Sequence, residues 1–86
     1  LPVMLGSQAD FTSEYWLVGE VFVDGAKVGE TRQLVTEAHL TSSGTVAYLK
    51  VQAPVQAAKG SVEVRVSKIA GSKSTALFSR STSYSL

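Results

Sequence analysis

The sequence predicts an all-β protein, a small antiparallel β-sandwich of six to seven strands that forms a single domain over residues 1–86. The clearest indication is the segment at residues 61–67, Ser-Val-Glu-Val-Arg-Val-Ser, in which polar and apolar side chains alternate without interruption. Successive side chains of a strand point to opposite faces, so the three valines share one face and the polar residues share the other. Residues 14–23 are rich in aromatic and β-branched types, which are favoured in sheets. Turn signals separate these short segments, a spacing typical of sandwiches and small barrels.

In chain order, residues 1–5 predict a short apolar edge strand and residues 6–13 predict a polar loop. The next strand, residues 14–23, is apolar on both faces, with Tyr15, Leu17, Val21 and Val23 on one face and Trp16, Val18 and Phe22 on the other. Such a strand is covered on both sides, or it is covered on one side and used for binding on the other. Gly19 inside it indicates a bulge or a close backbone approach.

Asp24-Gly25 predicts a hairpin turn, because glycine accepts the positive φ that such turns require. The short segment that follows is expected to break at Gly29-Glu30. Residues 32–40 predict a strand with one face formed by Leu34, Thr36, Ala38 and Leu40 and the other by Gln33, Val35, Glu37 and His39. After a turn at residues 41–44, residues 45–53 predict a strand with four inward residues, Ala47, Leu49, Val51 and Ala53.

Residues 54–60 form a connection that is compatible with a single helical turn over residues 55–58. The alternating valine strand then leads into a turn at residues 70–74. The last strand, residues 75–85, places Phe78 and Tyr84 on one face and Leu77 on the other. Its many serines and threonines suit an edge strand and equally a partly ordered tail.

The net charge of +1 argues against nucleic acid as a partner, and the absence of cysteine excludes thiolate metal sites and thiol catalysis. No run of eighteen apolar residues is present, so no membrane-spanning helix is predicted. Residues 1–43 carry six acidic and two basic residues, a charge of −4, whereas residues 44–86 carry one acidic and six basic residues, a charge of +5. The two halves are expected either to pair as neighbouring strands whose charges complement each other across the sheet, or to present an acidic edge and a basic edge to partners.

No motif for catalysis is present. His39 is the only histidine, and although Glu37 would share its strand face, two ligands do not make a zinc site. There is no Gly-x-Ser-x-Gly segment, and the only two aspartates, Asp10 and Asp24, fall in predicted loops. We therefore predict a protein that is not an enzyme and that uses no metal or cofactor.

The aromatic residues of the first half suggest a binding surface instead. Trp16 and Phe22, with Tyr15 and Tyr48, are the predicted partner-binding residues, because aromatic side chains on an apolar strand can form a groove for a partner helix or strand. The alternative interpretation is that these side chains belong to the hydrophobic core.

From Gln33 to Leu86 the pattern resembles the secretin pilot proteins (pilotins) of type III secretion systems and their β-sandwich lipoprotein relatives. The matching segments are Gln33-Leu34-Val35-Thr36-Glu37, Thr41-Ser42-Ser43-Gly44, Val46-Ala47-Tyr48-Leu49, Ser61-Val62-Glu63-Val64-Arg65-Val66, and Leu77-Phe78 with Tyr84. These are hydrophobic patterns rather than chemical motifs, so no functional residue is carried over. The family's lipid-bearing cysteine is absent, as expected for a processed chain that starts at Leu1 after its native N-terminus.

The resemblance implies a monomeric periplasmic protein of bacteria that is associated with the outer membrane only through a lipid anchor outside residues 1–86. Its partner would be a short segment of a secretin subunit, which it would escort to the outer membrane. The alternative hypothesis is a structural or adhesive module of a pilus, adhesin or capsid projection that assembles through its edge strands. A third, a small enzyme or hydrolase inhibitor, has no supporting motif.

Overall fold

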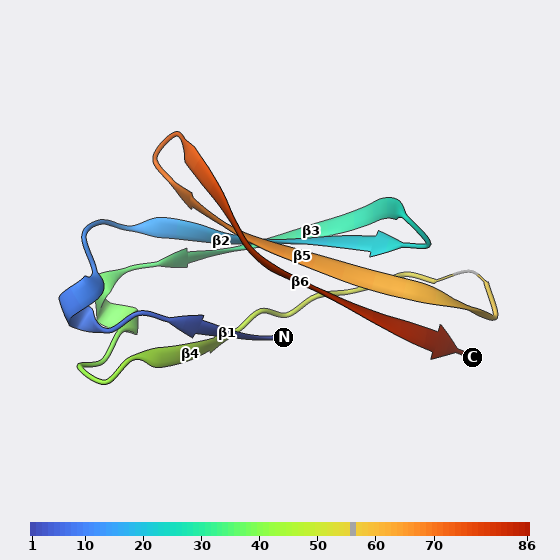
Figure 1. Ribbon diagram of the computed structural model, residues 1–86, viewed down its shortest axis with the longest axis horizontal. Coiled ribbons are helices and arrows are strands. Elements are labelled where there is room, and N and C mark those ends of the chain that lie inside the picture. The colour runs from blue at the N-terminus through green and yellow to red at the C-terminus, as the bar shows by residue number, and fades with distance from the viewer. Residues whose placement is uncertain (56) are drawn as a thin grey trace.

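The computed structural model describes residues 1–55 and 57–86. In these residues the chain forms six strands: β1 (Pro2–Leu5), β2 (Tyr15–Val23), β3 (Ala26–Val35), β4 (Thr45–Tyr48), β5 (Lys59–Ala70) and β6 (Lys73–Ser85). Single 3₁₀ turns, η1 (Gln8–Asp10) and η2 (Glu37–His39), precede β2 and β4 (Figure 1). The strands form two antiparallel sheets, a small one of β1 and β4 and a large one in the order β3-β2-β5-β6. The predicted all-β fold is confirmed.

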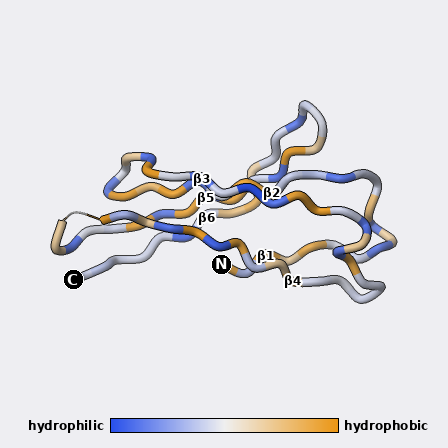
Figure 2. The backbone as a smooth tube through the Cα atoms, turned by 180° about the vertical axis from the view of Figure 1, so that it is seen from behind, coloured by the Kyte–Doolittle hydropathy of each residue, from blue (hydrophilic) through white to orange (hydrophobic). Residues whose placement is uncertain are grey.

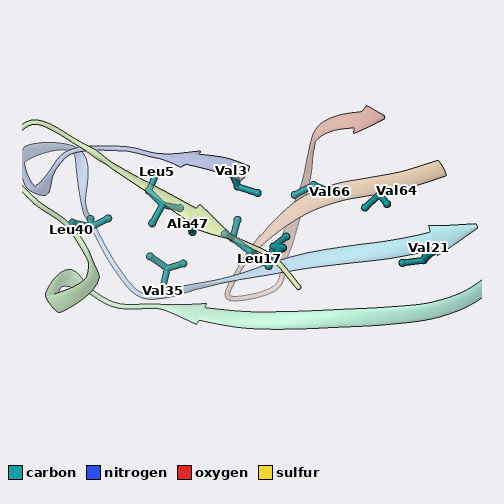
Figure 3. Packing of buried hydrophobic residues seen from close by; sticks show 10 residues of the cluster. Val3, Leu5, Leu17, Val21, Val35, Leu40, Ala47, Val64 and Val66 are labelled. Carbon is teal, nitrogen blue, oxygen red and sulfur yellow. The ribbon is translucent and has the colours of Figure 1, made fainter. Parts of the chain in front are cut away.

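The two sheets form two layers with the hydrophobic core between them (Figure 2). The inner face of the large sheet contributes Leu17 and Val21 from β2 and Val64 and Val66 from β5, as the alternation of both segments predicts. The small sheet covers them with the inward residues of its two strands, Val3, Leu5 and Ala47, and with Leu49 just beyond β4 (Figure 3). All of these side chains are buried, and no polar side chain among the described residues is buried with them.

The predicted hairpin turn at Asp24-Gly25 connects β2 and β3. Both residues have positive φ angles, 49° for Asp24 and 87° for Gly25, which is the backbone of a two-residue hairpin turn. Asp24 also fixes the turn to β5: its amide donates a hydrogen bond of 3.0 Å to the Ser61 carbonyl, and its Oδ1 accepts one of 2.8 Å from the Ser61 amide. The turn is therefore held by its own backbone and by the neighbouring strand.

The predicted break at Gly29-Glu30 is wrong, because β3 continues through these residues. Gly29 pairs with Val21 and Lys27 with Phe22, so Val28 has no partner and forms a β-bulge. The predicted strand over residues 32–40 is also wrong at its end, and the structure now shows which of its two faces is turned to the core. β3 ends at Val35, which is fully buried, whereas Leu34 turns away from the core.

The strand ends at Val35 because the chain leaves the large sheet there and crosses to the small sheet. Val35 pairs with Tyr15, the first residue of β2, so the ladder has no further partner to offer. The η2 turn then carries the chain from the large sheet to β4 in the small one. Glu37 and His39 consequently lie in this turn and not on a strand.

The strand predicted over residues 45–53 is shorter in the structure. β4 ends at Tyr48, whose partner Pro2 is the first residue of β1, and beyond it Leu49 and the Leu1 terminus bond to each other. Three of the four predicted inward residues do face the core, but Ala53 is exposed. The predicted helical turn over residues 55–58 includes Gln56, which lies outside the described residues.

Side chains, and not backbone, approach Gly19 closely: a Cβ atom there would lie 3.2 Å from the Thr31 Cγ2 and 3.6 Å from side-chain atoms of both Leu49 and Val51. The prediction of an edge strand at the end of the chain is confirmed, because β6 is an edge strand of the large sheet. Its Leu77 forms a second bulge, since Phe78 pairs with Val66 and Ala76 with Ser67.

The molecule is elongated, with extents of 46 × 26 × 16 Å. Its radius of gyration is 14.5 Å, against about 12 Å for a compact domain of this length. The small sheet lies under one part of the large sheet, and β5 and β6 extend past it toward the C-terminus (Figure 1). The face of the large sheet that is turned away from the small sheet is thus left without a covering layer in the described chain.

Candidate partner-binding surface

The outer face of the large sheet, turned away from β1 and β4, carries an apolar patch centred on Trp16. Strand pairing places Trp16 directly between Leu34 of β3 and Ile69 of β5. The adjoining row contains Val18, and β6 adds small and apolar side chains beyond it. We call this surface the Trp16 patch, and it comprises Trp16, Val18, Leu34, Ile69, Ala76 and Leu77.

The patch has a buried floor and exposed projections. Val18 is only 3% exposed although it lies on the outer face, so its neighbours pack closely around it. Trp16 and Leu77 stand above it and are each 42% exposed. At the β6 side a groove of about 380 Å³ lies between Leu77 and the pair Glu20 and Arg65. Leu34, Trp16, Ile69 and Val18 therefore lie side by side as one apolar cluster, and Ser67 lies between this cluster and Ala76 of β6.

Charged side chains of both signs border the patch on the β3 side. Lys27 Nζ lies 3.0 Å from Glu20 and 3.2 Å from Glu30, and Arg32 Nε lies 2.9 Å from Glu30. The hydrogen bonds from Arg32 and then Lys27 lower the pKa of Glu30, and the bonds to Glu20 and then Glu30 raise the pKa of Lys27. These pairs are largely exposed, so they contribute little to stability and instead form a charged rim.

The strand pairing and the ion pairs both bear on the first interpretation of the charge asymmetry. β2 of the acidic half does pair with β5 of the basic half, as that interpretation expects. However, the ion pairs of the described residues each join two residues of the same half: Lys27 and Arg32 pair with carboxylates of the first half, and Arg65 pairs with Glu63 at 2.9 Å. The strands of the two halves are therefore neighbours, but no ion pair among the described residues connects the two halves.

The four predicted partner-binding residues lie on three different surfaces. Trp16 and Phe22 share the outer face, yet Val18 and Glu20 separate them along β2. The Phe22 ring is covered by the Arg65 guanidinium, whose carbon lies 4.1 Å from the ring centroid in a cation–π contact. Phe22 is thus occupied within the domain and is not part of the Trp16 patch.

Tyr15 and Tyr48 lie elsewhere. Tyr15 is half-buried on the inner face, packs against the core, and has Lys68 Nζ 4.3 Å from its ring centroid. This burial raises the pKa of Tyr15. Tyr48 is 74% exposed on the small sheet, where its strand partner is Pro2. Only Trp16 of the four therefore belongs to the apolar patch.

Sequence reasoning missed Leu34 and Ile69, the two residues that flank Trp16. The alternation of residues 61–67 contained the signal for Ile69, because its continuation places odd-numbered residues on the polar, outer face. Leu34 required the register between β2 and β3, which the sequence does not reveal when both faces of a strand are partly apolar.

The only histidine lies in a local turn. The His39 Nδ1 accepts a hydrogen bond of 3.0 Å from the Thr36 amide, a capping arrangement of the η2 turn. Among residues 1–55 and 57–86, no three side chains of metal-binding type come together. The same residues include no helix with the length and apolar character needed to cross a membrane.

Comparison with known proteins gives no assignment: no family model, no curated protein and no solved structure matches the chain.

Proposed function

We propose that this domain is not an enzyme and that it binds a protein partner through the Trp16 patch. The observation that carries the proposal is the row Leu34–Trp16–Ile69, three adjacent large apolar side chains on a sheet face that no other part of the described chain covers. Tryptophan is enriched among the residues that dominate binding energy, and such residues lie at the centre of an interface. The charged rim of both signs suits a polar border around an apolar centre.

The mixed rim favours a protein over nucleic acid. A nucleic-acid site needs a basic surface that neutralises phosphates, whereas here Glu20 and Glu30 lie beside Lys27 and Arg32. A short extended or helical segment of a partner would bury its apolar side chains over Trp16. It would lose conformational entropy on docking and gain stability from burial, as coupled folding requires.

A narrower form of the proposal comes from the resemblance to pilotins alone. The partner would then be a segment of a secretin subunit, and the domain would act in the bacterial periplasm at the outer membrane. Any lipid anchor would lie outside residues 1–86. The surface and the identity of the partner are separate claims, and the experiment can test them separately.

The test uses Trp16→Ala with Tyr48→Ala as the matched control. Both remove an exposed aromatic side chain, but Tyr48 lies on the small sheet, away from the patch. Titration with the secretin subunit of the same genome should show an affinity loss of about 2 kcal/mol or more, roughly 30-fold, for Trp16→Ala only. Because Trp16 is the only tryptophan, its fluorescence should also shift to shorter wavelength on binding.

The outcomes separate the two claims. Equal losses for both variants, or none for Trp16→Ala in a folded protein, would exclude the Trp16 patch. If the secretin does not bind at all, a photo-crosslinking residue at position 16 of the full-length protein, with position 48 as control, should still capture one defined protein in cells. Absence of a position-specific adduct would then refute the binding proposal itself.

A further inference from the structure

Four strands of the two sheets have a free edge, and they differ in how well that edge is protected. β1 and β4 are only four residues long, and short edges offer little to pair with. β3 carries the ion pairs of Lys27, Glu30 and Arg32 and the bulge at Val28. Charges and bulges are devices that prevent edge-to-edge pairing.

The free edge of β6 lacks most of this protection. Only Lys73 and Arg80 are charged among its thirteen residues, and its single bulge lies at Leu77. Beyond the bulge, Phe78–Ser85 form a regular arm of eight residues whose ladder to β5 has no irregularity. Every second backbone N–H and C=O group of this arm points away from β5, because an antiparallel ladder uses alternate residues on each side. The pale colouring of the strand toward the C-terminus reflects its neutral polar side chains (Figure 2).

The side chains of this arm are sorted by face. Its pairing with β5 places serine at every second position of the outer face, Ser79, Ser81, Ser83 and Ser85. The inner face carries the larger side chains, Phe78, Arg80, Thr82 and Tyr84. The arm therefore presents a ladder of hydroxyl groups on one face and bulkier groups on the other.

We propose that β6 pairs antiparallel with β6 of a second copy of this chain, so that two large sheets join into one sheet of eight strands. Two identical antiparallel strands in one sheet are related by a two-fold axis normal to the sheet, which keeps each outer face on the outside. Outer-face residues then meet outer-face residues in every permitted register. Serine consequently faces serine along the ladder, a pairing that forms cross-strand hydrogen bonds.

Charge selects among the registers. An axis at Arg80 would place the two Arg80 side chains opposite each other, which is unfavourable for like charges. An axis at Ser81 or Thr82 pairs seven of the eight arm residues with one another and places Arg80 opposite Thr82 or Tyr84 of the second copy, respectively. These two registers are the ones we expect, and in both of them no like charges face each other.

A groove beside β6 also supports a second copy of this chain as the partner of the β6 edge. The small sheet and the inner side of β6 enclose a groove of about 310 Å³ lined by Pro2, Met4, Val46, Phe78 and Arg80. Met4 is 75% exposed there and Val46 is 39% exposed. A strand added to β6 extends the large sheet beside this groove and brings inner-face side chains of the second copy toward its apolar wall. The two surfaces adjoin at Leu77 of β6, but this proposal rests on the backbone edge of residues 78–85 and the partner-binding proposal rests on the row Leu34–Trp16–Ile69, so neither depends on the other.

The test uses cross-linking, because the chain has no native cysteine. Ser81→Cys and Thr82→Cys each place a thiol at one expected axis, and Ser72→Cys in the exposed β5–β6 turn is the control for random collision. Sedimentation of the unmodified protein should show a mass that rises with concentration from 9.1 kDa to twice that value. Oxidation should give a disulfide dimer for position 81 or 82 and none for position 72.

Lysine at the axis position that cross-links, Ser81→Lys or Thr82→Lys, places two positive charges opposite each other and should return the protein to 9.1 kDa with an unchanged circular dichroism spectrum. Trp16→Ala should leave the dimer intact. A mass of 9.1 kDa at every concentration, a dimer that persists with lysine at that axis position, or cross-linking that is equal at positions 72, 81 and 82 would each overturn the proposal. Growth beyond the dimer would also overturn it, because a two-fold pair of edges is closed.

Discussion

Gly60 of β5 lies between β6 and the turn that connects β2 and β3. Replacing it with alanine tests the contact between that turn and β5. Gly60 is at the start of β5 opposite Tyr84 of β6, and it lies beneath the carboxylate of Asp24. A Cβ atom at position 60 would lie 2.5 Å and 2.7 Å from the two Asp24 carboxylate oxygens and 2.9 Å from the Tyr84 hydroxyl oxygen. These distances are shorter than van der Waals contact, so the carboxylate must move.

The cost follows from what the carboxylate holds. Its Oδ1 accepts the 2.8 Å hydrogen bond from the Ser61 amide, which ties the β2–β3 turn to β5. A hydrogen bond to a charged group contributes about 1.5–3 kcal/mol, and this one is exposed, which favours the lower value. Replacing glycine by alanine also lowers the conformational entropy of the unfolded chain, which stabilises the folded state by about 0.4–1 kcal/mol and offsets part of this loss. The net loss for Gly60→Ala should be about 1 kcal/mol, equivalent to a fall in Tm of about 4–8 °C.

Differential scanning calorimetry with Gly29→Ala as control gives the measurement. A Cβ atom at position 29 would meet only the Gln52 carbonyl oxygen, at 3.7 Å, so this variant should unfold within about 0.5 kcal/mol of the parent. In an Asp24→Gly background, which removes the carboxylate and keeps the positive φ, the Gly60→Ala loss should disappear. An unchanged Tm for Gly60→Ala, or an equal loss in the Asp24→Gly background, would refute this reasoning.

Three further changes probe other parts of the fold. Val35→Ala removes two methyl groups from a fully buried side chain and should cost roughly 1–3 kcal/mol in urea unfolding, with an unchanged m-value. Gly19→Ala should cost about 1 kcal/mol in the same assay, because its added methyl meets packed side chains on the inner face. Burial, and then the charge of Asp24, raises the pKa of Tyr84, so the unfolded chain loses this proton first and stability should fall as the pH rises above about 10. Tyr84→Phe should make that fall smaller, and the remaining part should come from Tyr15, whose pKa is also raised by burial. An equal fall in the parent and in Tyr84→Phe would contradict the assignment.

Local chemistry in the sequence was sufficient to predict much of the fold. The valines of β5 alternate with charged residues, so only one strand orientation buries them. The Asp24-Gly25 turn could be predicted because few residue pairs accept two positive φ angles. β6 could be recognised as an edge strand because its side chains are mostly serine and threonine, which tolerate the solvent exposure of a strand that pairs on one side only.

The candidate site could be predicted only in part, because it depends on how strands align. Trp16 could be predicted as a candidate binding residue from its own chemistry, but its neighbours Leu34 and Ile69 come from other strands and are placed beside it only by the register. Leu34 and Val35 are both apolar, so alternation alone could not decide which one faces the core. Tyr15 and Tyr48 were grouped with Trp16 by residue type, and only the topology shows that they lie on other surfaces.

The pairing of β1 with β4 has a consequence for synthesis on the ribosome. β1 is made first, yet its partner begins only at Thr45, and the second neighbour of β2 begins at Lys59. Until then, the apolar side chains of the first strands, among them Val3 and Leu17, have no opposing layer in the nascent chain. The β2–β3 hairpin can form early, but the core can close only when the second half has emerged. The nascent first half therefore exposes apolar strands that are prone to aggregate, and it is the stage at which a chaperone would have most to protect.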